Sequence, residues 1–254
     1  MNVVVCVKQI PDPAVPGSLD ADHTLNRSGK LILDESDSFG VEMALQLVDA
    51  SGGGEVTLIS MAPNNEVSGL RTALAMGAAK AILVSDPALE GSDALSTAKV
   101  LAKSVERAGD IDLVLTATES TDGYTGVVPQ AVAEYLGVPA VTFAKAVESD
   151  GTTLKVRRQT EAGYDRVEAD LPAVVSVTAG VNEPRYPSLK GIMAAKSKPV
   201  DRLSVAELGL GALGPGQAIV SVVPAEQRAA GEIVEDDGTG AHRVVEFLAS
   251  RKVI

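Results

Sequence analysis

The sequence is poor in several residue types. Among 254 residues it has one cysteine, Cys6, no tryptophan and only 3% aromatic residues. A single cysteine excludes an internal disulfide framework and fits a reducing compartment. No apolar run approaches the ~20 residues that span a bilayer, and the early run Val3–Val7 is too short for a signal-peptide core. We therefore expect no membrane insertion, and a location in a bacterial cytoplasm or a matrix-like compartment.

Two further deficits limit the classes of partner and chemistry. The chain has 22 basic against 34 acidic residues, and its net charge of -12 would repel a polyanion, so we expect no nucleic-acid partner. The short motifs of P-loop proteins, serine hydrolases and zinc proteases are missing. His23 and His242 lie in unrelated regions, so we expect no metal site and no histidine-based triad. The chain thus lacks most of the standard catalytic motifs.

What the sequence does contain is an alternation of β-rich runs and helical periodicity. The apolar run Val3–Val7 predicts a buried strand, and Phe39, Met43 and Leu47 recur at the spacing of one helix face. Strand followed by helix, repeated four times, predicts an α/β fold with a Rossmann-like parallel sheet and helices on both faces. The other predicted strands cover residues 55–61, 81–84 and 111–115, and the predicted helices cover residues 36–50, 67–76, 93–105 and 126–137.

The pattern changes after Ala140. Asp150-Gly151 is a turn dipeptide between two β-rich runs. Residues 154–158, 166–170 and 173–178 are expected to complete the sheet as antiparallel or mixed strands. From Asp201 onward regular structure is expected to thin, except for a helix over residues 242–251. We expect a nucleotide-binding domain over residues 1–200 and a C-terminal arm over residues 201–254, which must pack on its own domain or on a partner.

The best candidate for nucleotide binding is the polar stretch from Ala117 to Gly126. It follows the fourth predicted strand and opens a helix. Ligands of parallel sheets bind at the carboxyl ends of the strands, where a helix N-terminus offers free N–H groups to phosphate. Ser120, Thr121 and Thr125 add hydroxyl groups to this stretch. The alternative interpretation is a polar loop with an ordinary helix cap, and these residues alone do not separate the two.

A second unusual stretch runs from Asn182 to Met193, within residues 182–198. Its two prolines keep its start from being helical. It also carries apolar residues in what is expected to be a loop. Lys190, Lys196 and Lys198 flank those residues, and a basic rim around an apolar tip suits a docking surface in an acidic protein. The alternative is a loop whose apolar residues fold back onto the sheet.

Two weaker features favour structural roles. The neighbours of Cys6 are valines, which disfavour the thiolate, so a buried and unreactive thiol is expected. The glycine-rich stretch 51–54 resembles the phosphate loop of ATP pyrophosphatases, but the Asp-Ser that should follow is missing and a strand comes next. A helix-to-strand loop is the better interpretation, which argues against a nucleotide-dependent ligase.

Several motifs in order along the chain resemble those of the beta (small) subunits of electron transfer flavoproteins. They begin with Val5-Cys6-Val7-Lys8-Gln9-Ile10-Pro11-Asp12 and Arg71-Thr72-Ala73-Leu74-Ala75-Met76-Gly77-Ala78. The family signature is matched as Val156-x-Arg158-x-x-Glu161-x-Gly163, followed by Leu171-Pro172-Ala173-Val174. Asn182-Glu183-Pro184-Arg185-Tyr186, Ile192-Met193-Ala194-Ala195-Lys196 and Gln227-Arg228-x-Ala230-Gly231 complete the set.

The resemblance implies a Rossmann-like subunit that binds AMP as a structural nucleotide, beside an alpha subunit that holds most of the FAD. Carried onto this chain, the contacts to AMP are expected at Cys6, Asp34, Glu35, Ser36, Asp37, Met61, Ala117, Thr118, Glu119, Ser120, Thr121, Asp122, Gly123, Tyr124 and Thr125. Partner flavin dehydrogenases, such as acyl-CoA dehydrogenases, are expected to dock on a recognition loop, with Leu189 as its anchor. The docking residues implied are Glu183, Pro184, Arg185, Tyr186, Leu189, Lys190, Ile192 and Met193.

Three alternatives to this interpretation stay open. The first is a stand-alone adenine-nucleotide-binding module resembling universal stress proteins, which would need neither the 182–193 stretch nor a long arm. The second is a ligase of the pyrophosphatase type. The third lies within the resembled family, some members of which bind a second FAD in place of AMP and bifurcate electrons.

Overall fold

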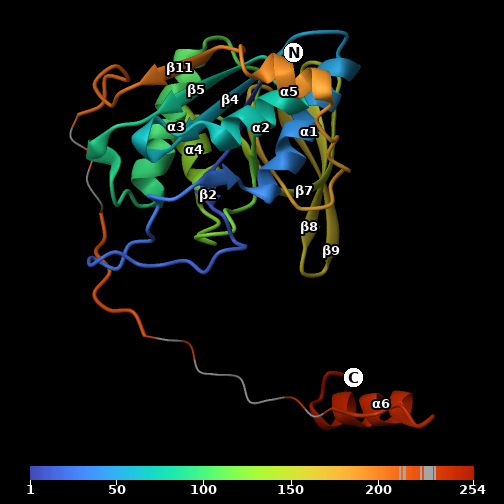
Figure 1. Cartoon of the computed structure of the whole chain (residues 1–254). Helices are drawn as coiled ribbons and strands as arrows, with labels where there is room; N and C mark the ends of the chain where they lie inside the picture. Colours follow the sequence, from blue (N-terminus) through green and yellow to red (C-terminus); the bar gives the residue numbers. More distant parts are fainter. Residues whose placement is uncertain (212, 214–215, 224, 226–230, 232) are drawn as a thin grey trace. The chain divides into compact units, whose positions relative to one another are not determined.

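The computed structural model describes residues 1–211, 213, 216–223, 225, 231 and 233–254 (Figure 1). The motif expected at Gln227-Arg228-x-Ala230 lies outside these residues. The described chain divides into two compact units, Met1–Val220 and Ser221–Ile254. The second unit contains one helix, α6 (Gly240–Ser250), close to the helix expected over residues 242–251. All other helices and strands described below belong to the first unit.

A nine-stranded sheet dominates the first unit, in the order β11-β5-β4-β1-β6-β10-β7-β8-β9. Every pair from β11 to β7 is parallel, whereas β7, β8 and β9 form an antiparallel meander. The short strands β2 and β3 pair separately. The strands are β1 (Asn2–Cys6), β2 (Gln9–Pro11), β3 (Leu31–Leu33), β4 (Glu55–Met61), β5 (Lys80–Val84), β6 (Leu113–Ala117), β7 (Ala140–Ser149), β8 (Thr153–Thr160), β9 (Gly163–Asp170), β10 (Ala173–Val177) and β11 (Val200–Leu203).

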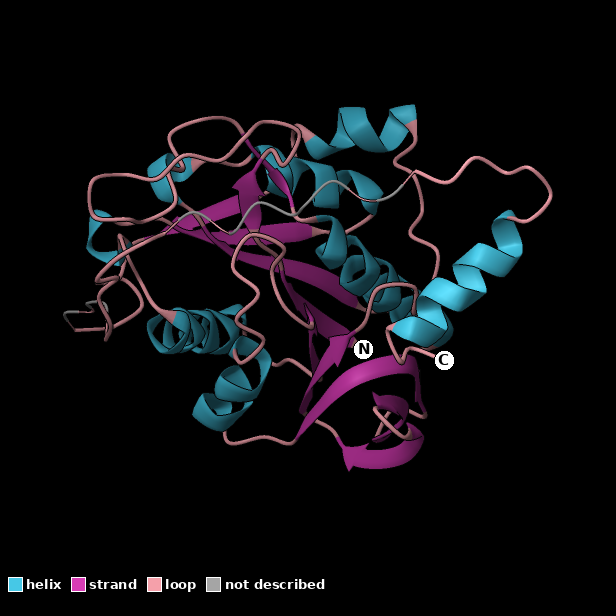
Figure 2. Ribbon diagram, turned by 90° about the horizontal axis from the view of Figure 1, so that it is seen from below, coloured by secondary structure: helices cyan, strands magenta, loops and turns pink. Residues whose placement is uncertain are grey.

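Helices cover both faces of the sheet (Figures 1 and 2), which confirms the predicted fold class. The helices are α1 (Glu35–Ala50), α2 (Ser68–Met76), α3 (Ala94–Ala108), α4 (Val128–Leu136) and α5 (Leu189–Ala195), with short 3₁₀ turns at Pro63–Asn65 and Pro87–Leu89. Side chains alternate along a strand, so Val3 and Val5 pack toward α1 and α2, while Val4 and Cys6 pack toward α3 and α4. This two-sided burial explains the continuous apolar run of β1.

The predicted helix ends agree well with the observed capping. The Asp93 carboxylate accepts the Ser96 N–H at 2.8 Å at the start of α3, and α2 ends at Gly77. At the end of α4, Gly137 takes the left-handed conformation at φ 67°, which glycine adopts without steric cost. The strand expected over residues 111–115 begins two residues later, and the helix expected from Gly126 begins at Val128.

The second half refines three expectations. The strands expected as antiparallel or mixed are of both kinds: β8 and β9 are antiparallel, whereas residues 173–177 form a central strand, β10, parallel to both β6 and β7. Among the described residues, regular structure thins after residue 203 and not at 201, because β11 pairs with β5, and Leu203, Val205 and Leu208 are buried in the core. The apolar residues from Leu189 onward form helix α5 and not a loop, because the prolines that exclude helix lie before residue 188.

Candidate functional site

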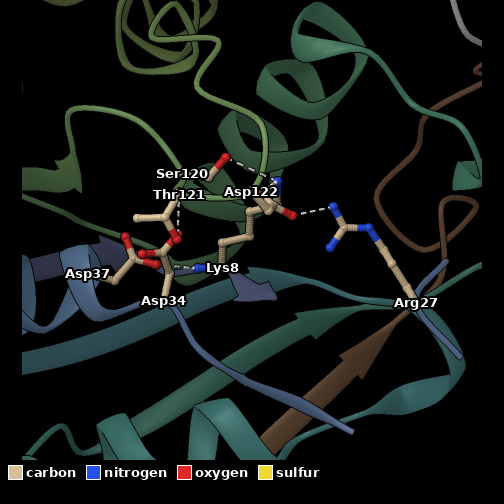
Figure 3. A network of polar contacts seen from close by, with 7 residues as sticks. All are labelled: Lys8, Arg27, Asp34, Asp37, Ser120, Thr121 and Asp122. Atoms are coloured by element: carbon tan, nitrogen blue, oxygen red, sulfur yellow. Dashed lines mark hydrogen bonds and ion pairs between the residues drawn. The ribbon is translucent and has the colours of Figure 1, made fainter. Parts of the chain in front are cut away.

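The predicted nucleotide loop lies at the topological switch point of the sheet. β1 has β4 on one side and β6 on the other. The chain builds the sheet from β1 through β4 to β5 on one side and then crosses over to β6 on the other side, so the strand order reverses at β1. In open α/β sheets this arrangement produces a crevice at the carboxyl ends of the strands, where ligands bind. The loop after β6, residues 118–127, lies at that end. The start of α1 and the chain leaving β1 at Lys8 lie beside it (Figure 3).

Asp34 joins the loop to the start of α1. One of its carboxylate oxygens accepts the Ser36 N–H at 3.0 Å and thereby caps α1. The other accepts the Thr121 N–H at 2.7 Å and the Thr121 hydroxyl at 3.1 Å. Asp34 is fully buried, so its carboxylate is committed to these contacts. Asp34 therefore shapes the site, and its side chain is not available as a first contact for a ligand.

Asp37 has a comparable role in the first turn of α1. Its carboxylate accepts the Lys8 N–H at 2.5 Å, at the point where the chain leaves β1. Burial raises the pKa of Asp37 well above its usual range, while the Lys8 N–H acts in the opposite direction and nearby Asp34 raises the pKa further. The predicted residues Glu35 and Ser36 lie between these two aspartates, with Glu35 exposed.

Two cations that sequence reasoning missed converge on Asp122. The Lys8 ammonium lies 2.6 Å from Asp122 Oδ1 and 3.2 Å from the Ser120 hydroxyl. Arg27, from the long loop between β2 and β3, pairs with Asp122 Oδ2 (Figure 3). Burial acts to raise the pKa of Asp122, but Lys8 and Arg27 outweigh it and leave that pKa below its usual value. Lys8 follows a strand and was detectable by position, whereas no local pattern marks Arg27.

The other predicted residues form the walls and the mouth of the site. Cys6 is buried, and burial raises the pKa of its thiol to about 12, which confirms the expected unreactive thiol. Met61 ends β4 at the same edge of the sheet. Ala117 is buried and the Thr118 hydroxyl donates to the Val177 carbonyl at 3.1 Å, which ties the loop to β10. The predicted residues of the loop that are exposed are Glu119, Gly123, Tyr124 and Thr125.

The mouth of the site has the chemistry to hold a phosphate group. In the described part of the chain, no side-chain hydrogen bond caps the start of α4, so the N–H groups of its first turn have no side-chain partner there, apart from Pro129, which has no N–H group. Gly126 precedes that start at φ 68°, a conformation that disfavours a side chain and leaves the backbone accessible. Lys8 keeps 39% of its side chain exposed although it is paired. Helix N–H groups with a nearby ammonium are typical of phosphate sites.

Segment 182–198 is anchored by a buried carboxylate on α1. Glu42 is only 4% exposed and accepts two hydrogen bonds from the Arg185 guanidinium, at 2.7 and 3.0 Å, and one from the Arg185 N–H at 3.2 Å. Burial acts to raise the pKa of Glu42, but the bonds from Arg185 and Gln46 outweigh it, so the pKa is lowered. The Asn182 amide adds a bond to the Phe39 carbonyl at 3.0 Å.

Helix α5 projects apolar side chains into solvent. Tyr186 is 97% exposed, Leu189 is 83% exposed, and Ile192 and Met193 are also exposed. Glu183 and Lys190 are exposed beside them, and Pro184 is half-buried. The apolar residues therefore do not fold back onto the sheet. Lys198 was expected in the basic rim, and this expectation is wrong. Its ammonium instead donates hydrogen bonds to the Leu74 and Ala78 carbonyls, at 2.9 and 2.6 Å.

Some classes of site find no support among the described residues. In those residues, no three His, Cys, Asp or Glu side chains gather as a metal-binding group. Over the same residues, none of the helices is both long enough and apolar enough to cross a bilayer. The polar groups that do converge lie at the switch point and along segment 182–198.

The fold defines an α/β protein with a Rossmann-like, mostly parallel sheet, flanked by helices and with a switch point at β1. The chain belongs to the electron transfer flavoprotein family, since the family model "Electron transfer flavoprotein domain" matches residues 22–208. "Electron transfer flavoprotein subunit beta" of Mycobacterium bovis is 40% identical over 100% of this chain and 99% of its own length. The protein of the same name from Megasphaera elsdenii is 34% identical, with both chains fully covered.

A further relative carries a different name. "Caffeyl-CoA reductase-Etf complex subunit CarD" of Acetobacterium woodii is 33% identical over 99% of this chain and 97% of its own. The family resemblance inferred from the motifs is thus confirmed, and with it an electron-transfer role associated with a flavin.

Proposed function

We propose that this chain is the beta subunit of a heterodimeric electron transfer flavoprotein and works as an electron carrier without a bond-making site of its own. FAD, held mainly by an alpha subunit, supplies the redox chemistry that takes electrons from flavin dehydrogenases, such as acyl-CoA dehydrogenases, and passes them on. The full-length similarity to proteins named subunit beta supports this assignment. A bacterial cytoplasmic or matrix-like location suits the proposal.

The switch-point site is proposed to hold AMP as a structural nucleotide. The observation that supports this proposal is the loop after β6, which Asp34, Asp122 and Thr118 tie to three separate parts of the chain. A loop fixed in this way pays little conformational entropy on binding. The start of α4 and the Lys8 ammonium provide donors to the phosphate group. Cys6 and Met61 form the wall of the site.

Segment 182–198 is proposed to dock the dehydrogenase. Leu189 supplies the apolar anchor, and Lys190 lies beside it as a cation. Arg185, named among the expected docking residues, also has a holding role through Glu42. The exposed apolar side chains of α6, including Val244 and Phe247, suit burial against the alpha subunit.

The composition of the purified complex tests the main proposal. The chain is co-expressed with its alpha subunit, the complex is purified, and the released nucleotides are identified by mass spectrometry. We expect one FAD and one AMP per heterodimer. A chain that purifies alone with ATP and no flavin partner would instead support the stand-alone adenine-nucleotide module and overturn the electron-carrier proposal.

A second candidate function is electron bifurcation, with a second FAD in place of AMP. The similarity to the Acetobacterium woodii protein, whose name places it in a reductase complex, favours keeping this candidate. The same mass-spectrometric measurement separates the two functions, because two FAD and no AMP per heterodimer is the result that bifurcation requires.

A further inference from the structure

An apolar groove runs between α2 and α5, beside the exposed face of segment 182–198. Its volume is about 350 Å³. A cavity of about 150 Å³ is enough to hold benzene, so this groove has room for a Leu, Met or Phe side chain. Its lining comes from both helices, from the turn before α5 and from the residue that follows α5: Arg71, Thr72, Ala75, Pro187, Ile192, Ala195 and Lys196.

The groove is continuous with the proposed docking surface. Ile192 lines the groove, and Leu189 lies three residues earlier on α5, so the two side chains occupy the same face of the helix. Leu189 therefore projects from the surface directly beside a hollow in it. A projection beside a hollow is the geometry with which two proteins exchange side chains across an interface.

Reciprocal hydrogen bonds hold the two walls of the groove in place. The Arg71 guanidinium of α2 donates to the carbonyls of Ala195 and Lys198, at 2.6 and 2.8 Å, at the end of α5. In return, the Lys198 ammonium donates to the carbonyls of Leu74 and Ala78 at the end of α2. Gly191 completes the contact, because a Cβ there would lie 2.5 Å from the Ala75 carbonyl oxygen. The groove is thus preformed, and filling it requires little reorganisation.

The charge around the groove indicates the kind of surface that can cover it. Lys190 and Lys196 are exposed on either side of Ile192, although the whole chain carries a net charge of -12. A local basic patch attracts an acidic partner surface, whereas two copies of this chain, each with a net charge of -12, repel one another overall. This complementarity argues for a different protein as the occupant.

We propose that the groove between α2 and α5 is a second docking subsite, which accepts an apolar side chain from an acidic surface of the electron-donating flavin dehydrogenase. This inference rests on the proposed function of the chain. Leu189 inserts into the dehydrogenase, and the dehydrogenase inserts a side chain into the groove. The motif from Arg71 to Ala78 then has a role, because it builds one wall and holds the other.

The test fills the groove in the intact heterodimer. Thr72 is exposed on α2, and Thr72→Trp places an indole in the groove, while Thr72→Val keeps the volume of the side chain and serves as the matched control. The dehydrogenase used is the one from the source organism that reduces the wild-type complex fastest. The measured quantity is the second-order rate constant with which this dehydrogenase reduces the flavin of the complex. We expect Thr72→Trp to lower this rate about tenfold, as for loss of an interface anchor, and Thr72→Val to leave it unchanged. Thr72→Leu, with an intermediate loss, replaces the Trp variant if that variant does not fold.

Leu189→Ala distinguishes failure of the subsite from failure of the proposed function. If Leu189→Ala slows reduction but Thr72→Trp does not, the subsite is wrong and the docking role of the segment stands. If no dehydrogenase reduces the wild-type complex, the proposed function itself is wrong. Equal losses for Thr72→Val and Thr72→Trp would also overturn the subsite. The wild-type rate should fall as salt is added, and a rate that is unaffected by salt would contradict the acidic partner surface.

Discussion

At the residue scale, Asp37 is a buried carboxylate at the start of α1. Its pKa is raised by burial, so between the ordinary value of about 3.9 and the raised value the folded chain binds more protons than the unfolded chain. The contribution of Asp37 to stability is therefore complete below pH 3.9 and declines as the pH rises.

This sign can be measured with Asp37→Asn. The free energy of unfolding of the wild type minus that of the variant should fall between pH 4 and pH 8, by on the order of 1 kcal/mol. The change with pH is the informative quantity, because the amide has a pH-independent effect of its own. Asp150→Asn is the control. The Thr152 N–H lowers the pKa of Asp150 to about 2. The free energy of unfolding of the wild type minus that of Asp150→Asn should therefore stay nearly constant between pH 4 and pH 8.

Lys8 is a residue of the site that the sequence analysis did not single out. Its ammonium is held by Asp122 and Ser120 at the mouth of the proposed AMP site. We expect Lys8→Met to weaken AMP binding to the complex by roughly 10- to 100-fold, the range for a hydrogen bond to a charged group. Calorimetric titration of AMP into the nucleotide-free complex measures this. Lys30→Met, at an exposed lysine of the same loop region, should bind AMP like the wild type. Equal affinities for the two variants would remove Lys8 from the site.

At the scale of elements, segment 182–198 depends on its attachment to α1. Arg185→Ala leaves the buried Glu42 carboxylate without its guanidinium, and we expect a loss of about 1–3 kcal/mol in the free energy of unfolding. Denaturant titration measures the loss, and Arg166→Ala, at an exposed arginine on β9, should change stability by less than about 0.5 kcal/mol. Arg185→Lys keeps the charge but loses the bidentate contact with Glu42. Its loss in the free energy of unfolding should therefore lie between those of Arg185→Ala and Arg166→Ala.

The Arg185 anchor has a pH dependence opposite to that of Asp37. The pKa of Glu42 is lowered in the fold, so the stabilisation is present above its ordinary value of about 4.3 and is lost as the pH falls through the lowered value. The difference in the free energy of unfolding between the wild type and Arg185→Ala should therefore become smaller as the pH falls below about 4.3. A gap that stays constant down to the acid transition would contradict the anchoring role of Glu42.

Helices and strands differ in how well they can be predicted from their own residues. The start of α3 at Asp93 and the strand Glu55–Met61 were predictable because caps and strand runs are local patterns. Helix α5 was not predicted, since its seven residues are too few for a clear period and two prolines lie just before it. Its stability comes from contact with α2 through Gly191 and Arg71, which no local pattern reveals.

At the scale of the whole molecule, strand order decides where the site lies. β10 enters the sheet between β6 and β7, although β6 and β10 are separated by a helix and three strands in the chain. A run such as Ala173–Val177, buried on both faces, indicates a central strand but not which neighbours it takes. Its position matters for function, because β10 receives the bond from Thr118 that ties down the loop of the proposed nucleotide site.

The sequence by itself determined the fold class, most of the helices and strands, the unreactive Cys6 and, through ordered motifs, the family. These follow from periodicity, caps and composition, all of which act over a few neighbouring residues. Only the tertiary structure brought Lys8 and Arg27 to Asp122, Arg185 to Glu42, and α5 against α2 to form the groove. Those partners are tens of residues or more apart along the chain, and the physical reason is that such contacts are selected by packing and charge in three dimensions and leave no local signal in the sequence.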